Sequence, residues 1–588
     1  MNFFKSFLAS CLGSLVAFIV LIFLVISLFT AAVSSFSSSE TSVVVEDNSV
    51  LQLRLDVPIT EMEVENPLEG LPIPGATESA IGLIKLKSVI KHAEEDSKIK
   101  GIYLDVSMFM GGYAKAKEIR DALLDFRKSG KWVIAYNEYM TEQAYYIISA
   151  ADKVYLNPEG QMEFNGMAIE VSFFKKMFDK LEIKPEIFRV GDFKSAVEPF
   201  FLDKMSDANR LQLTELINGI NGEVIKEIAT TRNIEVKRLK EISDKMLATT
   251  TQEALNLHLI DSLFYYDQVL NELRNRLNIG SSEKITFIKY NKYKKTVNEI
   301  NSSKNEIAVI VADGDIISGK AQQGTIGSTT FAEELRKARE SKKVKAIVLR
   351  INSPGGSALA SDVMWREVTL ASKEKPIIAS MGDYAASGGY YIAMGCDTIV
   401  AQPNTITGSI GVFSVLFDLS SFLDNKIGIT FDEVKTGEVG ELATVTRPLT
   451  NPEKAIWQKS TDRVYETFTR KAAEGRNMPV DQLRKVASGR VWTGTQAKER
   501  GLVDVIGSFD DAIKIAAEKA GVANDYKVKY YPKYKSFLEQ WMADMEENSK
   551  TKALKTELGI HYKVYEQVQK LKRYQGAQAR LPFEMQVQ

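Results

Sequence analysis

The feature that most constrains the fold of this chain is a long internal repeat. The stretch KIKGIYLDVSMFMGG in the first half matches KVKAIVLRINSPGG in the second. Farther along, YYIISAADKVYLNP matches YYIAMGCDTIVAQP, so that Tyr145 corresponds to Tyr390 and Asp152 to Asp397 with one common spacing. A period this long indicates two copies of one structural unit, and each assignment made in one copy constrains the other.

Each copy opens with a β-branched strand, VLQLRLDVPI or EIAVIVADGDI, and then alternates short apolar strands with amphipathic helices. This alternation predicts an α/β fold rather than a sandwich. A helical arm follows each core, at residues 203–277 and 451–520. We therefore predict one α/β repeat over residues 40–300 and a second over 301–525. Residues 526–588 are rich in Lys and Gln, have no counterpart after the first copy, and are predicted to form a helical tail.

The N-terminus carries a separate signal. Residues 7–33 are almost continuously apolar, which exceeds the roughly 20 residues that span a bilayer and the roughly 7–15 residues of a signal-peptide core. We predict that residues 1–39 form a cytoplasmic stub and one retained transmembrane helix, although small residues after the span leave cleavage open. Lys5 precedes the span and Glu40 follows it, so the positive-inside rule leaves the rest of the chain outside the cytoplasm.

Composition excludes several classes of function. The formal net charge is −1, which argues against a polyanion-binding surface and therefore against nucleic acid as a partner. The chain has three histidines and two cysteines, and none of them has metal-ligand spacing. The repeat places His258 opposite Gly501, the residue type expected just past a helix end. His258 is thus interpreted as a helix cap rather than a catalytic base.

A candidate nucleophile lies in the stretch DYAASGGYYIA, where Ser387 stands between an apolar strand and the start of a helix. Taken alone, this turn is more typical of an ordinary capped helix. The first copy supplies the contrast. It has Glu142 opposite Ser387, and it has FMGG opposite SPGG. Only the second copy therefore keeps both the serine turn and the intact glycine loop.

A residue that only the first copy has kept is the candidate base. The first copy contains Lys194 in FRVGDFKSAVEPF, and matching Gly191 with Gly437 places Gly440 opposite this lysine. A serine hydroxyl needs a base to act as a nucleophile, and a lysine can serve if desolvation lowers its pKa. Apolar neighbours of Lys194 would provide that desolvation. Most lysines are simply exposed on the surface, but the reciprocal loss favours a function for this one.

Three glycines complete the predicted site. The backbone N–H of Gly388 and those of the Gly355-Gly356 loop could hold an oxygen that develops negative charge. The same loop would also serve as a plain strand-to-helix turn. A further glycine turn, TGSIGV, contains Ser409, which we interpret as structural or substrate-lining rather than nucleophilic.

With these motifs in hand, the chain resembles the signal peptide peptidase A (protease IV) family in its long, tandem-repeat form. The match rests on NSPGG, DYAASGGYYIA and GDFKSAVEPF and extends over essentially everything after the apolar N-terminus. The resemblance implies two tandem crotonase/ClpP-like α/β repeats and a serine peptidase with Ser387 as nucleophile and Lys194 as general base. Gly388, Gly355 and Gly356 would form the oxyanion hole, and no metal or organic cofactor would be needed.

The resemblance also implies a setting and partners. The family digests released signal peptides and other hydrophobic peptides at the external face of the bacterial inner membrane, and it assembles into homo-oligomers such as a tetrameric bowl. Two other readings stay open. A crotonase-like acyl-thioester hydrolase would need a pocket for a nucleotide, and no basic cluster suits one. A catalytically inactive, membrane-tethered peptide-binding scaffold is disfavoured because both members of the dyad are present.

Overall fold

The computed structural model describes residues 43–63, 80–297, 302–322, 324–531 and 577–581, together with residues 7, 12–18, 20–24 and 27 of the apolar N-terminus. The predicted membrane span therefore falls in large part outside the described residues. Within the described part of the chain, no helix combines the length and the apolar character needed to cross a membrane.

The first repeat folds around a parallel sheet with the strand order β8-β6-β5-β4-β1-β9. The bounds of its strands are β1 (Ser49–Arg54), β4 (Ile99–Asp105), β5 (Trp132–Met140), β6 (Lys153–Met162), β8 (Ser262–Leu263) and β9 (Phe287–Lys289). A two-stranded pair lies beside it, β2 (Ile59–Thr60) with β3 (Ile81–Gly82). Its helices are α2 (Leu83–Glu95), α3 (Tyr113–Lys128), α4 (Glu142–Ile148), α5 (Lys175–Leu181), α6 (Glu198–Phe201), α7 (Asp207–Arg232), α8 (Val236–Asp244), α9 (Thr251–Asn256), α10 (Tyr266–Leu277) and α11 (Tyr290–Tyr293).

The second repeat reproduces this order as β20-β16-β15-β13-β10-β21, and β15 also pairs with β17, which pairs with β19. Its strands are β10 (Glu306–Asp313), β13 (Val344–Ser353), β15 (Ile377–Ala386), β16 (Thr398–Ala401), β17 (Ile406–Gly408), β19 (Val491–Thr493), β20 (Val505–Ile506) and β21 (Lys527–Tyr531). Its helices are α12 (Ser328–Glu340), α13 (Ala358–Ser372), α14 (Gly388–Ala393), α15 (Ser420–Phe422), α16 (Asn451–Gly475), α17 (Val480–Val486), α18 (Gly494–Glu499) and α19 (Phe509–Lys519). The predicted α/β class is confirmed.

Matched polar residues hold the two sheets in the same way. The carboxylate of Asp152 accepts the N–H of Val133 at 2.8 Å, and that of Asp397 accepts the N–H of Ile377 at 2.8 Å. Each carboxylate therefore ties the loop before one strand to the start of its neighbour. The two copies therefore share not only their sequence pattern but also this hydrogen bond.

The boundary predicted for the tail needs a correction. Residues 527–531, which we assigned to a helical tail, form β21 on the free side of β10. The segment KVKYY is rich in β-branched and aromatic residues, which favour a pleated, half-buried position. β21 is the counterpart of β9 in the first repeat. Of the remaining tail, only residues 577–581 are described.

A third sheet takes strands from both repeats and from the tail, in the order β12-β11-β14-β22-β18-β7. Its strands are β7 (Lys184–Val190), β11 (Asp315–Ile317), β12 (Thr325–Gly327), β14 (Gly355–Ser357), β18 (Val412–Asp418) and β22 (Gln578–Arg580). β7 of the first repeat pairs antiparallel with β18 of the second along its whole length. This pairing brings residues just after Val190 into the second repeat.

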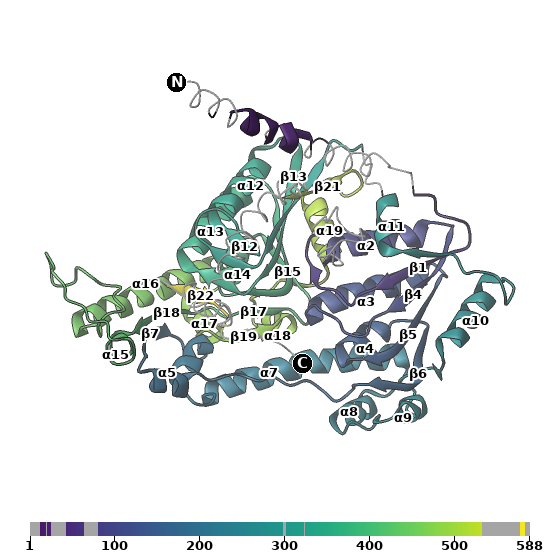
Figure 1. Ribbon diagram of the computed structural model, residues 1–588, viewed down its shortest axis with the longest axis horizontal. Coiled ribbons are helices and arrows are strands. Elements are labelled where there is room, and N and C mark those ends of the chain that lie inside the picture. The colour runs from purple at the N-terminus through teal and green to yellow at the C-terminus, as the bar shows by residue number, and fades with distance from the viewer. Residues whose placement is uncertain are drawn as a thin grey trace.

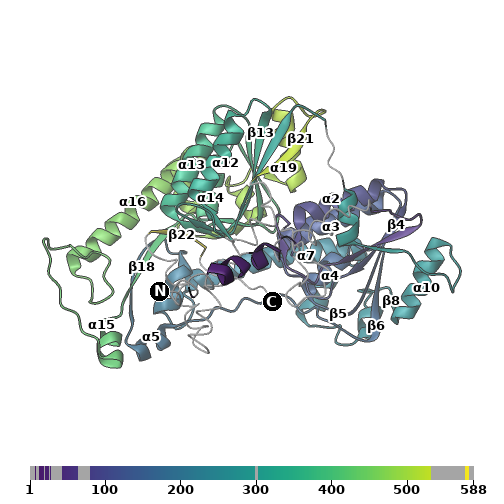
Figure 2. The same cartoon turned by 45° about the horizontal axis from the view of Figure 1, so that its top comes forward.

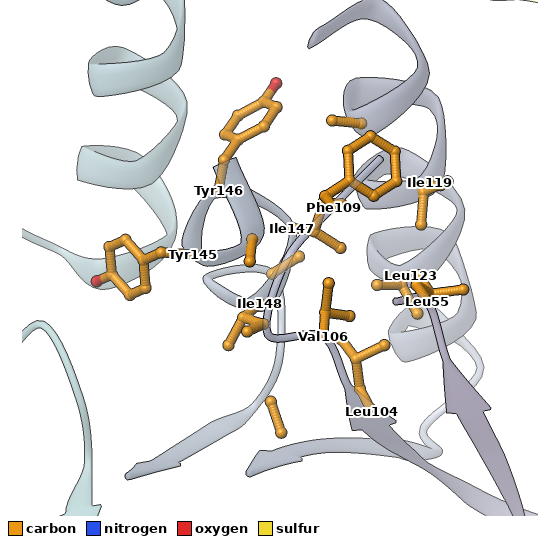
Figure 3. Close-up of a cluster of buried hydrophobic side chains, with 14 of the residues drawn as sticks. Leu55, Leu104, Val106, Phe109, Ile119, Leu123, Tyr145, Tyr146, Ile147 and Ile148 are labelled. Carbon is orange, nitrogen blue, oxygen red and sulfur yellow. The ribbon is translucent and has the colours of Figure 1, made fainter. Parts of the chain in front are cut away.

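The two units lie side by side, and the long helix α7 runs beneath them (Figure 1). The first core packs the helix α4 near the end of β4, with Ile148 on the side of Val106, while the Tyr145 ring points away from that strand (Figure 3). Ala386 of the second repeat belongs to this same apolar cluster. The first core therefore reaches the residue next to Ser387.

Candidate active site

Ser387 sits in a backbone conformation that is unusual for a residue other than glycine. Its φ is 54° and its ψ is −111°, between the end of β15 and the start of α14. The backbone N–H of Ser387 donates to the carbonyl of Gly408 at 2.8 Å, and its own carbonyl accepts from Tyr391 at 2.8 Å. Such strain persists only where the surroundings impose it. The Ser387 side chain makes no cap bond to α14, so its hydroxyl is available for another partner.

The β7–β18 pairing delivers Lys194 to that hydroxyl. After Val190 the chain turns at Gly191, whose φ is 101°, and the N–H of Phe193 donates to the carbonyl of Ser488 at 3.0 Å. The backbone of Lys194 then lies against Gly489, where an added methyl group would come within 2.7 Å of the lysine Cβ and N. A loop of the second repeat thus holds the lysine of the first.

The structure brings the two predicted catalytic side chains together. Lys194 Nζ lies 2.9 Å from Ser387 Oγ, and both side chains are fully buried. Lys194 Nζ also lies 3.0 Å from Ser409 Oγ and 3.3 Å from the Ser409 carbonyl oxygen. Lys194 Nζ therefore has three oxygen neighbours, all from the second repeat.

The surroundings of Lys194 favour its neutral form. Desolvation by burial holds the pKa of Lys194 well below its ordinary value of 10.5, because an ammonium group is costly to remove from water. Among the residues that the structure describes, no carboxylate forms an ion pair with Lys194 to offset that cost. A neutral amine has two N–H donors and one lone pair. The two Ser409 oxygens can accept the donors, which leaves the lone pair directed at the Ser387 hydroxyl.

The glycine loop packs directly against the serine turn. A methyl group added at Gly355, whose φ is 101°, would lie 2.7 Å from the backbone nitrogen of Gly388. The N–H of Gly355 itself donates to Ser353 Oγ at 3.2 Å. The absence of a side chain at Gly355 therefore lets the loop approach Gly388 closely, but the N–H of Gly355 is already used by Ser353. The N–H groups of Gly356 and Gly388 remain the candidate donors to an oxyanion.

A buried ion cluster fixes the position of one repeat against the other. Arg350 on β13 lies 2.7 Å from Glu61 and 2.8 Å from Glu118, and all three side chains are almost fully buried. Burial alone would raise the pKa of Glu118, but Arg350 and Lys87 together lower it to about 2. Removing one partner from such a cluster leaves an uncompensated buried charge. The cluster thereby fixes the first repeat, which carries Lys194, against the second, which carries Ser387.

Sequence reasoning missed two parts of this site. Ser409 was interpreted as structural or substrate-lining, yet it supplies two of the three oxygens around Lys194 Nζ. Its φ of 52° is the backbone signature that the glycine turn TGSIGV could have suggested. Gly489 was not singled out at all. The prediction for His258 agrees with the structure, because its φ of 60° is that of a helix-end residue and Gly501 has a φ of 74°.

In the part of the chain that the structure describes, no group of three or more His, Cys, Asp or Glu side chains is arranged to hold a metal ion.

Comparisons with known proteins agree with the duplication. A family model described as peptidase family S49 matches residues 125–280 and 369–523, one segment in each repeat. Protease 4 of Haemophilus influenzae is 34% identical over 545 residues, which cover 89% of this chain and 86% of that protein. A chloroplastic serine protease SPPA of Arabidopsis thaliana is 35% identical over 495 residues, or 82% of this chain and 71% of that protein. The solved structure of ClpP1 from Listeria monocytogenes aligns at 17% identity with a TM-score of 0.23, covering 35% of this chain and 94% of that one.

Proposed function

The chain belongs to peptidase family S49 and is a serine peptidase, and from that premise we propose that Ser387 is its nucleophile and Lys194 its general base. The observation that carries the assignment is the buried 2.9 Å approach of Lys194 Nζ to Ser387 Oγ. Residues 40–300 would form the domain that supplies the base, and residues 301–525, extended by β21 to residue 531, the domain that supplies the nucleophile.

The proposed reaction moves one proton back and forth. Neutral Lys194 accepts the hydroxyl proton as Ser387 Oγ bonds to the carbonyl carbon of a peptide. The resulting oxyanion is stabilised by the N–H groups of Gly388 and of the Gly355-Gly356 loop, with Gly356 as the available donor there. The C–N bond then breaks, and the Lys194 ammonium gives its proton to the leaving amine. Water hydrolyses the acyl-enzyme with Lys194 again acting as base.

We propose hydrophobic peptides, such as signal peptides after their release, as the substrates. A relative from Enterococcus faecium carries the name putative signal peptide peptidase SppA and is 33% identical over 215 residues. The apolar residues 7–33 support anchorage by a single span in the bacterial inner membrane, with the catalytic part outside the cytoplasm. An enzyme held there would meet apolar peptides where they accumulate.

We also propose that the protein is a homo-oligomer, a tetramer. Exposed apolar side chains are concentrated on the arm between α15 and α16, and such patches are typical of interaction surfaces. They are Ile427, Ile429, Phe431, Val434, Val439 and Val445. Light scattering of the detergent-solubilised protein measures the assembly, and a monomer would contradict it.

The test of the dyad uses Ser387→Ala and Lys194→Ala on a hydrophobic peptide. Removal of either member of a nucleophile–base pair is expected to lower kcat by about 10³-fold or more. Lys204→Ala is the matched control, since this lysine is exposed and lies in the same segment, and it should retain full activity. Unchanged cleavage in either dyad variant would leave the protein as a peptide-binding scaffold or assign its chemistry to other residues.

A further inference from the structure

The backbone at Lys194 forms a tight turn that belongs to no regular helix or strand. Lys194 has a φ of −78° and a ψ of 72°, and the N–H of Ser195 donates to the carbonyl of Phe193 at 2.8 Å. A hydrogen bond across one residue with dihedrals near about −75° and +65° is an inverse γ-turn. Lys194 is therefore the central residue of such a turn, and Phe193 and Ser195 are its two corners.

A buried amide side chain on the helix α7 holds both corners of this turn. α7 extends from β19 of the second repeat to the apolar core of the first (Figure 2). Gln212 on this helix is 1% exposed. Its Nε2 donates to the Phe193 carbonyl at 3.0 Å and to Ser195 Oγ at 2.7 Å. One side chain thus fixes the backbone on either side of Lys194.

The other end of the same amide reaches the second repeat. Gln212 Oε1 accepts the N–H of Val491 at 3.4 Å. The orientation of the amide follows from its neighbours, because a carbonyl oxygen can only accept and a backbone N–H can only donate. The residue before Val491, Arg490, accepts the N–H of Ser409 at its carbonyl, at 2.7 Å. Gln212 therefore connects the turn at Lys194 to the chain segment that also holds Ser409.

Buried polar side chains at the start of α7 complete this arrangement. Ser195 Oγ donates to Asn209 Oδ1 at 2.8 Å, and Asn209 Nδ2 donates to Glu198 Oε2 at 3.0 Å. Glu198 Oε1 accepts the hydroxyl of Ser206, the N-cap of α7, at 2.5 Å. Ser195, Glu198 and Asn209 are each at most 2% exposed. Because satisfied buried networks are rigid, the turn at Lys194 and the start of α7 form one unit.

We propose that Gln212 is the positioning residue of the general base. The inference rests on the proposed function of Ser387 and Lys194. Gln212 takes no part in making or breaking bonds. It holds the γ-turn so that the long, flexible side chain of Lys194 keeps its Nζ 2.9 Å from Ser387 Oγ and 3.0 Å from Ser409 Oγ. A displacement of about 1 Å at a reacting group can cost about 10²-fold in rate.

The first test is the variant Gln212→Leu, which keeps a side chain of similar size and removes the amide. We expect kcat on a hydrophobic peptide to fall by about 10²-fold and KM to stay within about twofold, because the groups assigned to the peptide carbonyl are untouched. Leu216→Ala is the control, since Leu216 is completely buried in the first core one turn farther along α7. It should lower the unfolding temperature but leave kcat within about twofold. An unchanged kcat in Gln212→Leu, or an equal loss in both variants, overturns the proposal.

A double-variant cycle shows whether Gln212 acts through Lys194. The rate at which a serine-directed acylating probe modifies Ser387 is measured in the wild type, Gln212→Leu, Lys194→Ala and the double variant. Gln212→Leu should slow the labelling of the wild type by about 10²-fold but that of Lys194→Ala by no more than about twofold. Equal slowing in both backgrounds overturns the positioning role and leaves the dyad intact. Labelling of Lys194→Ala at the wild-type rate overturns the proposed function instead.

Ser195→Ala keeps the proposal testable if Gln212→Leu does not fold. This change removes one of the two corner contacts of Gln212 and leaves the bond to the Phe193 carbonyl. We expect kcat to fall by about tenfold at a similar KM. Ser243→Ala is the matched control, because Ser243 is also completely buried in the first repeat but lies on α8, and its kcat should equal that of the wild type. Equal kcat values in the two serine variants overturn the proposal.

Discussion

In the first repeat, the helix α4, which follows β5, begins with an ordinary N-cap. Thr141 has a φ of −77°, and its side chain accepts the N–H of Ala144. The next residue, Glu142, turns inward and accepts the backbone N–H groups of Asn165 and Gly166 at 2.9 and 2.7 Å. In the second repeat the residue at this place is Ser387, with positive φ and no cap bond. The same joint is a relaxed support in one copy and a strained, chemically available hydroxyl in the other.

The glycine loops beside these two helix starts also differ, in the groups that their backbones contact. In the first repeat, the N–H of Gly112 donates to the Asp383 carboxylate at 3.0 Å, and the N–H of Lys115 donates to its other oxygen at 3.0 Å. That loop therefore binds the Asp383 carboxyl group of the other repeat through two backbone N–H groups. In the second repeat, the backbone at Gly355 instead packs closely against the Ala579 carbonyl of the tail, which lies 2.1 Å from the position that a Cβ of residue 355 would occupy. The two loops therefore differ in what their backbones approach, a carboxylate of the other repeat in the first and a tail carbonyl in the second.

We expect the largest effect on peptide hydrolysis from adding one methyl group to the glycine loop of the second repeat, compared with the same change in the first. In Gly355→Ala, the added carbon meets backbone atoms at 2.1 and 2.7 Å at a φ of 101°. Because this distorts the oxyanion site, we expect kcat/KM on a hydrophobic peptide to fall by about 10²–10³-fold. Gly111→Ala is the matched change in the first repeat, where the atoms nearest the added carbon belong to the side chains of Phe109 and Ile59 rather than to the backbone. Its kcat/KM should stay close to that of the wild type, and equal losses in both variants would remove the distinction.

The pH dependence of peptide hydrolysis measures the state of the base. Since burial lowers the pKa of Lys194 and the reaction needs the neutral amine, kcat/KM should rise with pH and reach its plateau well below the ordinary lysine value of 10.5. On the acid side, each unit of pH should cost about tenfold in kcat/KM. A profile that reaches its plateau only near the ordinary lysine value would contradict a desolvated base.

Ser409→Ala should have a smaller effect on the same profile. This change removes one oxygen 3.0 Å from Lys194 Nζ but leaves the nucleophile and the carbonyl of Ser409 in place. We expect kcat to fall by about tenfold, because the lysine is less well oriented. The acid limb should also move to lower pH, since a lost hydrogen-bond acceptor disfavours the charged amine. An acid limb that moves to higher pH would show that Ser409 does not support the ammonium form.

The α/β fold and the proximity of Ser387 to Lys194 could be predicted because both leave a direct trace in the sequence. Matching residues of the two copies revealed the scaffold, and mismatches at Ser387 and Lys194 revealed what each copy had kept. Ser409 and Gly489 could not be predicted in the same way. Their roles depend on the antiparallel pairing of β7 with β18, and no spacing along the chain encodes which edges meet. The strand β22 in the tail was missed for a related reason, since a three-residue strand is stabilised by its partners β14 and β18 rather than by its own sequence pattern.

We expect the smallest change in activity from Glu142→Ser, which gives the start of α4 in the first repeat the residue type that the second repeat has at Ser387. Glu142→Ser places a hydroxyl at the position that corresponds to Ser387. The N-cap at Thr141 keeps the backbone there in a relaxed conformation, and Lys194 lies beside Ser387 rather than beside residue 142. Peptide hydrolysis should therefore stay within about twofold of the wild type, as for substitutions remote from a reacting group. The variant should unfold at a lower temperature, because two backbone N–H groups lose their acceptor at a cost of roughly 1–3 kcal/mol. A serine-directed acylating probe should still modify Ser387 alone. Labelling at position 142 would mean that the scaffold by itself can activate a serine, and the contrast between the two copies would then lie only in which residue type each one carries.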